Sequence, residues 1–280
     1  MILAMPTSSL KFADHVPQLP GSTLLLALSG WMDGGLVSTG TVRQLMQDRT
    51  LVEVAEVEPA GFYIDSFPGS MELIALFRPH VKYEEGVITE FEMAKNLAVA
   101  DPAANMVFFI GREPNLNWTV FGDCIFEIVQ RVGCSRIIFV GSFGGTVPHT
   151  REPRLYGSVS GKHLVPSLTK HGLRATDYEG PASFSTYLLA HAPKHNVEMT
   201  NIAAEIPGYL QGPNPLSIEA VTRRLAHMLG LTVDFAAMHE TSTAWELHVT
   251  DLVAKDDELA ATVRKLEAVS YTHLTLPTKA

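Results

Sequence analysis

Apolar residues are arranged along this chain in short uninterrupted runs, separated by polar segments that contain glycine. Three runs have almost no polar alternation: Thr23–Ser29, Asn105–Ile110 and Arg136–Val140. Runs of this kind are typical of strands buried on both faces, as in a parallel sheet covered by helices. We therefore expect these three strands to pair in parallel within one sheet. Less regular runs predict further strands at Leu51–Val57 and Val197–Ile206.

Between these runs, apolar residues recur every three or four positions, which is the pattern of an amphipathic helix. The clearest example is Trp118–Val132, with Asn117 as its expected N-cap and Gly133 as its C-terminal glycine. Asp33 precedes a second such pattern, and we expect its carboxylate to accept from the first-turn amides of that helix. Because strands alternate with helices, the sequence predicts a three-layer α/β/α fold with a mostly parallel central sheet. Further helical patterns occupy 183–192, 218–228 and 233–268.

The chain divides by composition into four parts. Residues 1–22 are a polar lead-in that contains proline, 23–212 form the expected α/β core domain, and 213–268 form a helical C-terminal region. Residues 269–280 (VSYTHLTLPTKA) resemble the translation of a sequencing adapter. We expect this last segment to be foreign to the native chain and to take no part in the fold.

Two stretches have a weaker pattern. In the segment from Gly61 to Ala100, the residues Lys82–Phe91 predict at most one edge strand. The segment Leu155–Leu173, rich in glycine, serine and histidine, is expected to be a connection. Neither stretch carries enough periodicity to place it in the sheet.

Composition favours a soluble cytoplasmic protein with a sizeable core. The chain is 46% hydrophobic and 18% charged, which argues against disorder. Its formal net charge of -9 argues against nucleic acid or an anionic membrane as the main partner. Cys124 and Cys134 form no CxxC motif, which suits a reducing compartment and predicts ordinary buried thiols. The sequence shows no signal peptide and no apolar stretch of membrane-spanning length.

Three polar loops each begin where a predicted buried strand ends: Gly30–Gly35, Gly111–Asn117 and Gly141–Arg151. The carboxyl ends of parallel strands share one edge of a sheet, where open α/β sheets bind ligands and partners. We therefore expect the charged side chains of these loops to lie in one region. Glycine and aspartate also serve turns and caps, so a purely structural use carries about equal weight. The candidate binding residues are Asp33, Arg112, Glu113, His149 and Arg151.

Known catalytic signatures are incomplete. Ser142 follows a strand, as a nucleophile does, but Val140 stands where G-x-S-x-G requires glycine. The sequence contains neither GxxxxGK[ST] nor GxGxxG, so it predicts no phosphate cradle and no cofactor. His191 and His195 have helical spacing but no third ligand, and we expect no metal. We expect Trp31 and Trp118 to pack against their own loops.

Five short motifs, taken in order, carry a family resemblance. GWMDGG at 30–35 resembles GWxDAG, and Gly111–Trp118 resembles GxEPxxxW. The others are VPHTR at 147–151, YEGP at 178–181 and PNP at 213–215. Together they resemble the proteasome assembly chaperone 2 family, in its bacterial, actinobacterial-like branch, with Gly34 where alanine is usual. The resemblance adds Tyr178 and Glu179 to the candidate binding surface.

This resemblance implies a nucleoside-phosphorylase-like α/β/α fold that is often oligomeric, with eukaryotic and archaeal relatives that help to assemble proteasome rings. The first hypothesis is therefore a non-catalytic scaffold that binds a protein partner or a second copy of itself. The alternative is a small-molecule-binding enzyme, phosphorylase- or hydrolase-like or an ATP-dependent ligase, that uses the strand-end loops. If a small anion binds there, the amides after Asp33 and the Arg151 guanidinium should supply the positive field, with His149 as donor.

Overall fold

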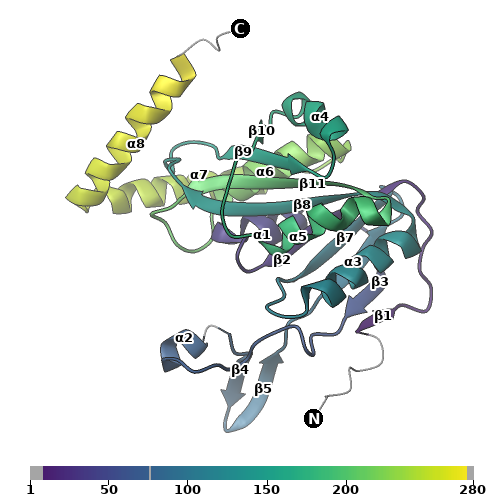
Figure 1. Cartoon of the computed structure of the whole chain (residues 1–280). Coiled ribbons are helices and arrows are strands. Elements are labelled where there is room, and N and C mark those ends of the chain that lie inside the picture. The colour runs from purple at the N-terminus through teal and green to yellow at the C-terminus, as the bar shows by residue number, and fades with distance from the viewer. Residues whose placement is uncertain (1–8, 76, 276–280) are drawn as a thin grey trace.

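One nine-stranded sheet runs through the centre of the fold, in the order β1-β3-β6-β7-β2-β8-β11-β9-β10 (Figure 1). The structure is a computed structural model that describes residues 9–75 and 77–275. The strands of this sheet are β1 (Leu10–Phe12), β2 (Ser22–Ser29), β3 (Val52–Val57), β6 (Leu97–Asp101), β7 (Met106–Arg112), β8 (Cys134–Gly145), β9 (Arg154–Val159), β10 (Arg174–Ala175) and β11 (Glu198–Pro207).

The four strands in the middle of the sheet are parallel. β2 pairs in parallel with β7 on one side and with β8 on the other, and β11 pairs in parallel with β8. Leu25 lies beside Phe108 and Ile138 in this register, and all three side chains are buried. The parallel pairing predicted from the uninterrupted apolar runs is confirmed. Antiparallel pairs flank this centre, with β6 on β7, β3 on β6, β1 on β3 and β9 on β11.

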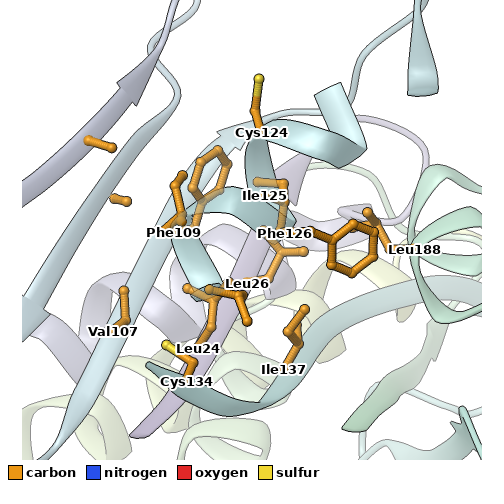
Figure 2. Packing of buried hydrophobic residues seen from close by; sticks show 14 of the residues in the cluster. Leu24, Leu26, Val107, Phe109, Cys124, Ile125, Phe126, Cys134, Ile137 and Leu188 are labelled. Atoms are coloured by element: carbon orange, nitrogen blue, oxygen red, sulfur yellow. The ribbon is translucent and has the colours of Figure 1, made fainter. Parts of the chain in front are cut away.

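Helices cover both faces of the sheet and complete the expected three layers. One face packs against α3 (Trp118–Val132) and α5 (Phe184–His191), and Figure 2 shows Leu24 and Leu26 of β2 beside Ile125 of α3. The other face packs against α1 (Val37–Met46), α4 (Val165–Lys170) and α6 (Pro215–Leu229). Short 3-10 turns complete these connections: η1 (Gly34–Leu36), η2 (Lys162–Leu164) and η3 (Ala192–His195).

The C-terminal part continues with two further helices, α7 (Ala236–Val253) and α8 (Asp257–Thr275). They share a small apolar cluster in which Val249, Val253 and Val263 are buried. The segment expected to be foreign begins within α8, and its last five residues, 276–280, lie outside the described residues. Within the described ranges, no helix combines the length and the apolar character needed to cross a bilayer.

Two predicted connections prove to be regular structure. The loop expected from Gly141 starts later, because β8 continues to Gly145 and pairs with β11 as far as Pro207. Its glycines indicated a turn locally, but the neighbouring strand supplies the ladder of hydrogen bonds. Gly145 is needed there because a Cβ atom would collide with the Glu205 side chain. The segment expected to be an irregular connection after Leu155 instead contains most of β9, η2 and α4.

An arm, residues 64–75 and 77–95, projects from these layers (Figure 1). The single edge strand expected at Lys82–Phe91 is wrong: β4 (His80–Glu84) and β5 (Val87–Glu92) form a separate antiparallel hairpin. Glu85 and Gly86 both have positive φ and turn the chain between the strands. The short helix α2 (Met71–Ala75) precedes the hairpin. Every residue of both strands is exposed.

Candidate functional site

The carboxyl ends of β2, β7, β8 and β11 lie at one edge of the sheet, and we call this edge the strand-end surface. Backbone bonds join the loops there. The amide of Ser142 donates to Met32 O at 2.8 Å, and that of Asn214 donates to Gly35 O at 2.8 Å. The predicted loops therefore do share one edge, although their side chains face different neighbours.

Asp33 accepts from a first-turn amide of α1, as expected, although Leu36 is the N-cap residue of that helix. It is 7% exposed, and its Oδ1 and Oδ2 accept from the amide (3.1 Å) and Oγ1 (2.8 Å) of Thr39 in α1. Burial raises the pKa of Asp33, and the bonds from Thr39 oppose the rise. Because Asp33 already occupies the Thr39 amide, that amide is not available to an external anion. Asn117 is the N-cap residue of α3, as expected, but its side chain does not cap the helix: its φ is 54°, and its Nδ2 donates to Gly61 O.

Glu113 ties two elements together. Its Oε2 accepts from the Trp31 amide at 2.9 Å, and its Oε1 accepts from the Phe184 amide at 2.8 Å. Phe184 is the first residue of α5, where the free amides and the helix dipole favour a carboxylate. This glutamate therefore holds the loop after β2 against the start of α5, and neither of its oxygens is free of a protein partner.

We expect Glu113→Ala to lower the free energy of unfolding by about 2–3 kcal/mol, because two amides lose a charged acceptor. Glu113→Gln keeps one acceptor oxygen and should lose about half as much. Denaturant titration followed by circular dichroism measures both. The matched control is Glu127→Ala, an exposed glutamate of α3, which should change stability by less than about 0.5 kcal/mol. Equal losses of stability in Glu113→Ala and in the control would show that Glu113 does not hold these two elements together.

Arg112 faces a different part of the edge from its neighbour Glu113. Its guanidinium lies over the Tyr63 ring, 5.3 Å from the ring centroid. Its backbone amide donates to Asn96 Oδ1 at 3.0 Å, and the Tyr63 hydroxyl lies 2.7 Å from the same oxygen. Burial raises the pKa of Tyr63, so this phenol stays protonated. Arg112 and Tyr63 line a cleft of about 740 Å³ between the strand ends and the arm.

His149 and Arg151 lie after β8, against the C-terminal helices. His149 is 2% exposed, with Nδ1 2.7 Å from the Tyr209 hydroxyl and Nε2 3.1 Å from Thr250 Oγ1 of α7. Burial lowers the pKa of His149, which favours the neutral ring. Arg151 is half-buried, and its amide closes a turn on Pro148 O. These contacts hold the loop after β8 against α7. Within the described residues, His149 makes no direct contact with Asp33.

The remaining candidate residues are exposed or bonded to nearby backbone atoms. Tyr178 is 68% exposed and its hydroxyl donates to Pro181 O at 3.2 Å, while Glu179 is exposed. Ser142 is fully buried and donates to Gly34 O at 2.6 Å, which makes it a structural hydroxyl. His191 packs on its own helix, with Nδ1 2.8 Å from Tyr187 O. The described residues hold no group of three or more side chains suited to a metal ion.

Sequence reasoning missed Glu205, which is 5% exposed at the end of β11. Its Oε1 accepts from the Thr146 amide at 2.7 Å, and its Oε2 lies 3.2 Å from Arg154. The sequence did contain a signal for this residue, because a single glutamate in the apolar run before Pro207 indicates a buried carboxylate with a partner. Trp31 was also misjudged: it is 71% exposed, whereas Trp118 packs as expected with its Nε1 on Pro114 O.

Comparison with known proteins places the chain in a family. Residues 27–253 match the PAC2 family, and no curated protein matches. A Mycobacterium tuberculosis protein of unknown function is similar in structure, with a TM-score of 0.80, 20% identity and coverage of 95% of this chain and 89% of that one.

Two other similar structures are of proteasome-related proteins. A proteasome-assembly chaperone homologue from Mycobacterium tuberculosis has a TM-score of 0.73 and 24% identity, over 86% of this chain and 99% of that one. PbaB, an archaeal proteasome activator from Pyrococcus furiosus, has a TM-score of 0.64 and 16% identity, over 87% and 97%. These likenesses show a common fold. Because the family match spans most of the sequence, the chain belongs to the PAC2 family.

Proposed function

We propose that this protein is a cytoplasmic, non-catalytic scaffold that binds proteasome subunits, in the manner of a proteasome-assembly chaperone. The observation that carries the proposal is the arm, on which several large apolar side chains are exposed. The family membership and the proteasome-related roles of two structural relatives support the choice of partner. The strand-end surface contributes the exposed Trp31 to the same proposal.

Large apolar side chains are concentrated on the arm. Tyr83 of β4 and Val87, Ile88 and Phe91 of β5 are between 52% and 66% exposed, and Met71 of α2 is 84% exposed. A two-stranded hairpin is at best marginally stable alone in water, because it cannot bury an apolar face. Exposed apolar patches on soluble proteins mark interaction sites. The arm is therefore built to be covered by a partner.

The charged side chains of the hairpin indicate what kind of partner surface it would bind. Besides its apolar residues the hairpin carries four carboxylates and a single lysine, and Lys82 is already 2.9 Å from Glu84 and 3.4 Å from Glu90. The net acidic rim favours a partner surface that is apolar at its centre and basic around it. Aromatic residues such as Tyr83 and Phe91 are the types that dominate binding energy at interfaces.

The strand-end chemistry supports a scaffold more than an enzyme. A nucleophile needs a base within hydrogen-bond reach and access to substrate. Ser142 donates to a backbone oxygen, Asp33 is bonded to Thr39, and both ring nitrogens of His149 have side-chain hydroxyl partners. The candidate catalytic groups of the sequence are thus used to hold the loops in place.

The test is direct binding of the purified chain to purified proteasome α-subunits of Mycobacterium tuberculosis, the source of the assembly-chaperone homologue. We expect saturable binding by biolayer interferometry. The double variant Ile88→Ser/Phe91→Ser should weaken it at least tenfold, as expected for central apolar anchors. The matched control is Leu247→Ser on α7, which is also highly exposed at 64% and should bind like the wild type.

Sedimentation velocity of the same samples shows whether the arm mediates self-association. An arm-dependent oligomer that ignores the α-subunits would overturn the proposed partner. Binding that survives the double variant would overturn the proposed surface. A chain that stays monomeric and binds no α-subunit would contradict the proposal as a whole.

A further inference from the structure

The cleft beside Arg112 lies where an open α/β sheet offers its natural ligand site. β2 and β7 are adjacent and parallel, and the helices that follow them depart to opposite faces: α1 to one and α3 to the other. Such a switch point leaves a crevice outside the carboxyl ends of the two strands. The cleft of about 740 Å³ is lined there by Ser29 at the end of β2 and by Arg112 at the end of β7.

The lining is cationic although the chain is acidic overall. It contains four permanent cations and two carboxylates, whereas the formal net charge of the chain is -9. None of the four cations makes a side-chain hydrogen bond or an ion pair within the described ranges. They come from α1, the end of β7 and both ends of the hairpin segment. They are Arg43, Arg78, Lys95 and Arg112, and the carboxylates are Asp65 and Glu92.

Two of these cations stand on elements of the core. Arg112 is anchored through its backbone to Asn96, a fully buried side chain, and its guanidinium is steered by the Tyr63 ring. Arg43 follows Thr39 by one helical turn, and Thr39 is fixed by Asp33. The two guanidinium groups thus stand on rigid elements at either side of the strand ends, where unsatisfied donors suit an oxyanion.

Apart from Ser29, Thr39 and His80, the rest of the lining is apolar or aromatic and includes Met46 of α1 and Phe91 and Met93 of the arm. A volume of this size, with a few convergent polar groups in an apolar wall, fits a drug- or nucleotide-sized molecule. We propose that the cleft binds a small organic oxyanion, carrying phosphate or carboxylate groups on a largely apolar body. This goes beyond the scaffold function, since it requires no protein partner, and the ligand would contact both the core and the arm.

This site differs from the anion site expected from the sequence. Arg151 and His149 lie on the loop packed against α7, and Asp33 fills the amide that an anion would need. A second basic cleft lies between α6 and β9, but three of its arginines already have partners: Arg154 with Glu205, Arg223 with Glu152 and Arg224 with His171 O. Among the described residues, Arg174 is the one arginine of that second cleft without such a partner, whereas all four cations of the cleft at Arg112 lack one.

Isothermal titration calorimetry at low ionic strength tests the site with AMP, ATP, citrate and inorganic phosphate. Adenosine is the uncharged control and should bind at least tenfold more weakly than AMP. We expect Arg112→Gln and Arg43→Gln each to raise Kd about tenfold, equivalent to about 1.4 kcal/mol. Asp65→Asn should lower Kd roughly twofold, because it removes a repelling charge. Arg174→Gln, in the second basic cleft, should leave Kd unchanged.

Hydrogen exchange localises the ligand independently: amides at 78–95 should exchange more slowly when it is bound. Arg43 is exposed on α1, so its variant should fold even if Arg112→Gln does not, and unfolding midpoints check both. Binding that is lost in Arg174→Gln but kept in Arg43→Gln would overturn this assignment. The same conclusion would follow if no anion of the panel bound at millimolar concentration. Neither outcome depends on the proteasome-binding test, whose variants and readout are different.

Discussion

Phe121→Ala is expected to lower the free energy of unfolding by about 3–5 kcal/mol, the usual range for losing a fully buried aromatic ring. Phe121 of α3 has no exposed surface. Its ring meets those of Phe62 and Phe184 edge-to-face, with centroid separations of 4.9 and 5.4 Å. The substitution removes these contacts and leaves a cavity between α3, α5 and the segment before the arm. Denaturant unfolding monitored by circular dichroism gives the free-energy difference.

Two comparisons make this prediction specific. Phe121→Leu keeps most of the apolar volume and should cost less than half as much, because the cavity is smaller. Leu247→Ala removes a side chain that is 64% exposed on α7 and should change stability by less than about 0.5 kcal/mol. If Phe121→Ala lost no more than Leu247→Ala, the aromatic cluster would not be part of the cooperative core.

The centre of the fold could be predicted because buried positions require apolar residues, and these recur in a pattern typical of each element. Strands covered on both faces admit almost no polar residue, so the runs at Thr23–Ser29 and Asn105–Ile110 identified β2 and β7. Helices covered on one face show apolar residues every three or four positions, which identified α3. Chain order then favoured parallel pairing, because a helix between two strands returns the chain to the same end of the sheet.

The margins of the sheet could not be predicted in the same way. β4 and β5 are exposed on both faces, so no burial pattern marks them, and the turn at Glu85–Gly86 lies inside what looked like one strand. The extension of β8 through Gly144 and Gly145 depends on pairing with β11, about sixty residues later. Such long-range pairing overrides the local preference of glycine for turns.

For the candidate site, the sequence predicted the shared edge but not the direction of the side chains. Arg112 and Glu113 are adjacent, yet one faces the cleft and the other clamps α5. Side chains alternate along an extended backbone, so consecutive residues diverge even where a loop has been placed correctly. Of the other cations of the cleft, Arg43 lies on a predicted helix, but Arg78 and Lys95 come from the arm, whose position no local pattern fixes.

Glu205→Ala is expected to lower the free energy of unfolding by about 3–5 kcal/mol, because it leaves the half-buried Arg154 guanidinium and the Thr146 amide without their charged acceptor. Glu205 accepts from the amide and Oγ1 of Thr146 at 2.7 and 3.1 Å and pairs with Arg154 at 3.2 Å. The double variant Arg154→Met/Glu205→Ala removes both charges and should recover part of that loss. A double variant less stable than Glu205→Ala would show that the pair is not coupled. Denaturant titrations of the three proteins give the comparison.

The Glu205 carboxylate should also make the free energy of unfolding depend on pH. Burial raises the pKa of Glu205, but the Thr146 amide and the Arg154 guanidinium outweigh burial, so its pKa lies below the ordinary value of 4.5. A depressed pKa in the folded state means that unfolding takes up protons. The stabilisation from Glu205 is therefore complete above about pH 4.5 and is lost as the pH falls through the lower, folded-state pKa. Glu205→Gln lacks this titration. The loss in its free energy of unfolding relative to wild type should therefore be constant above pH 5 and shrink below pH 4.5.

Denaturant titrations of both proteins between pH 7 and pH 3 measure this difference. A difference that stays constant down to pH 3 would show that Glu205 is not stabilised as a carboxylate.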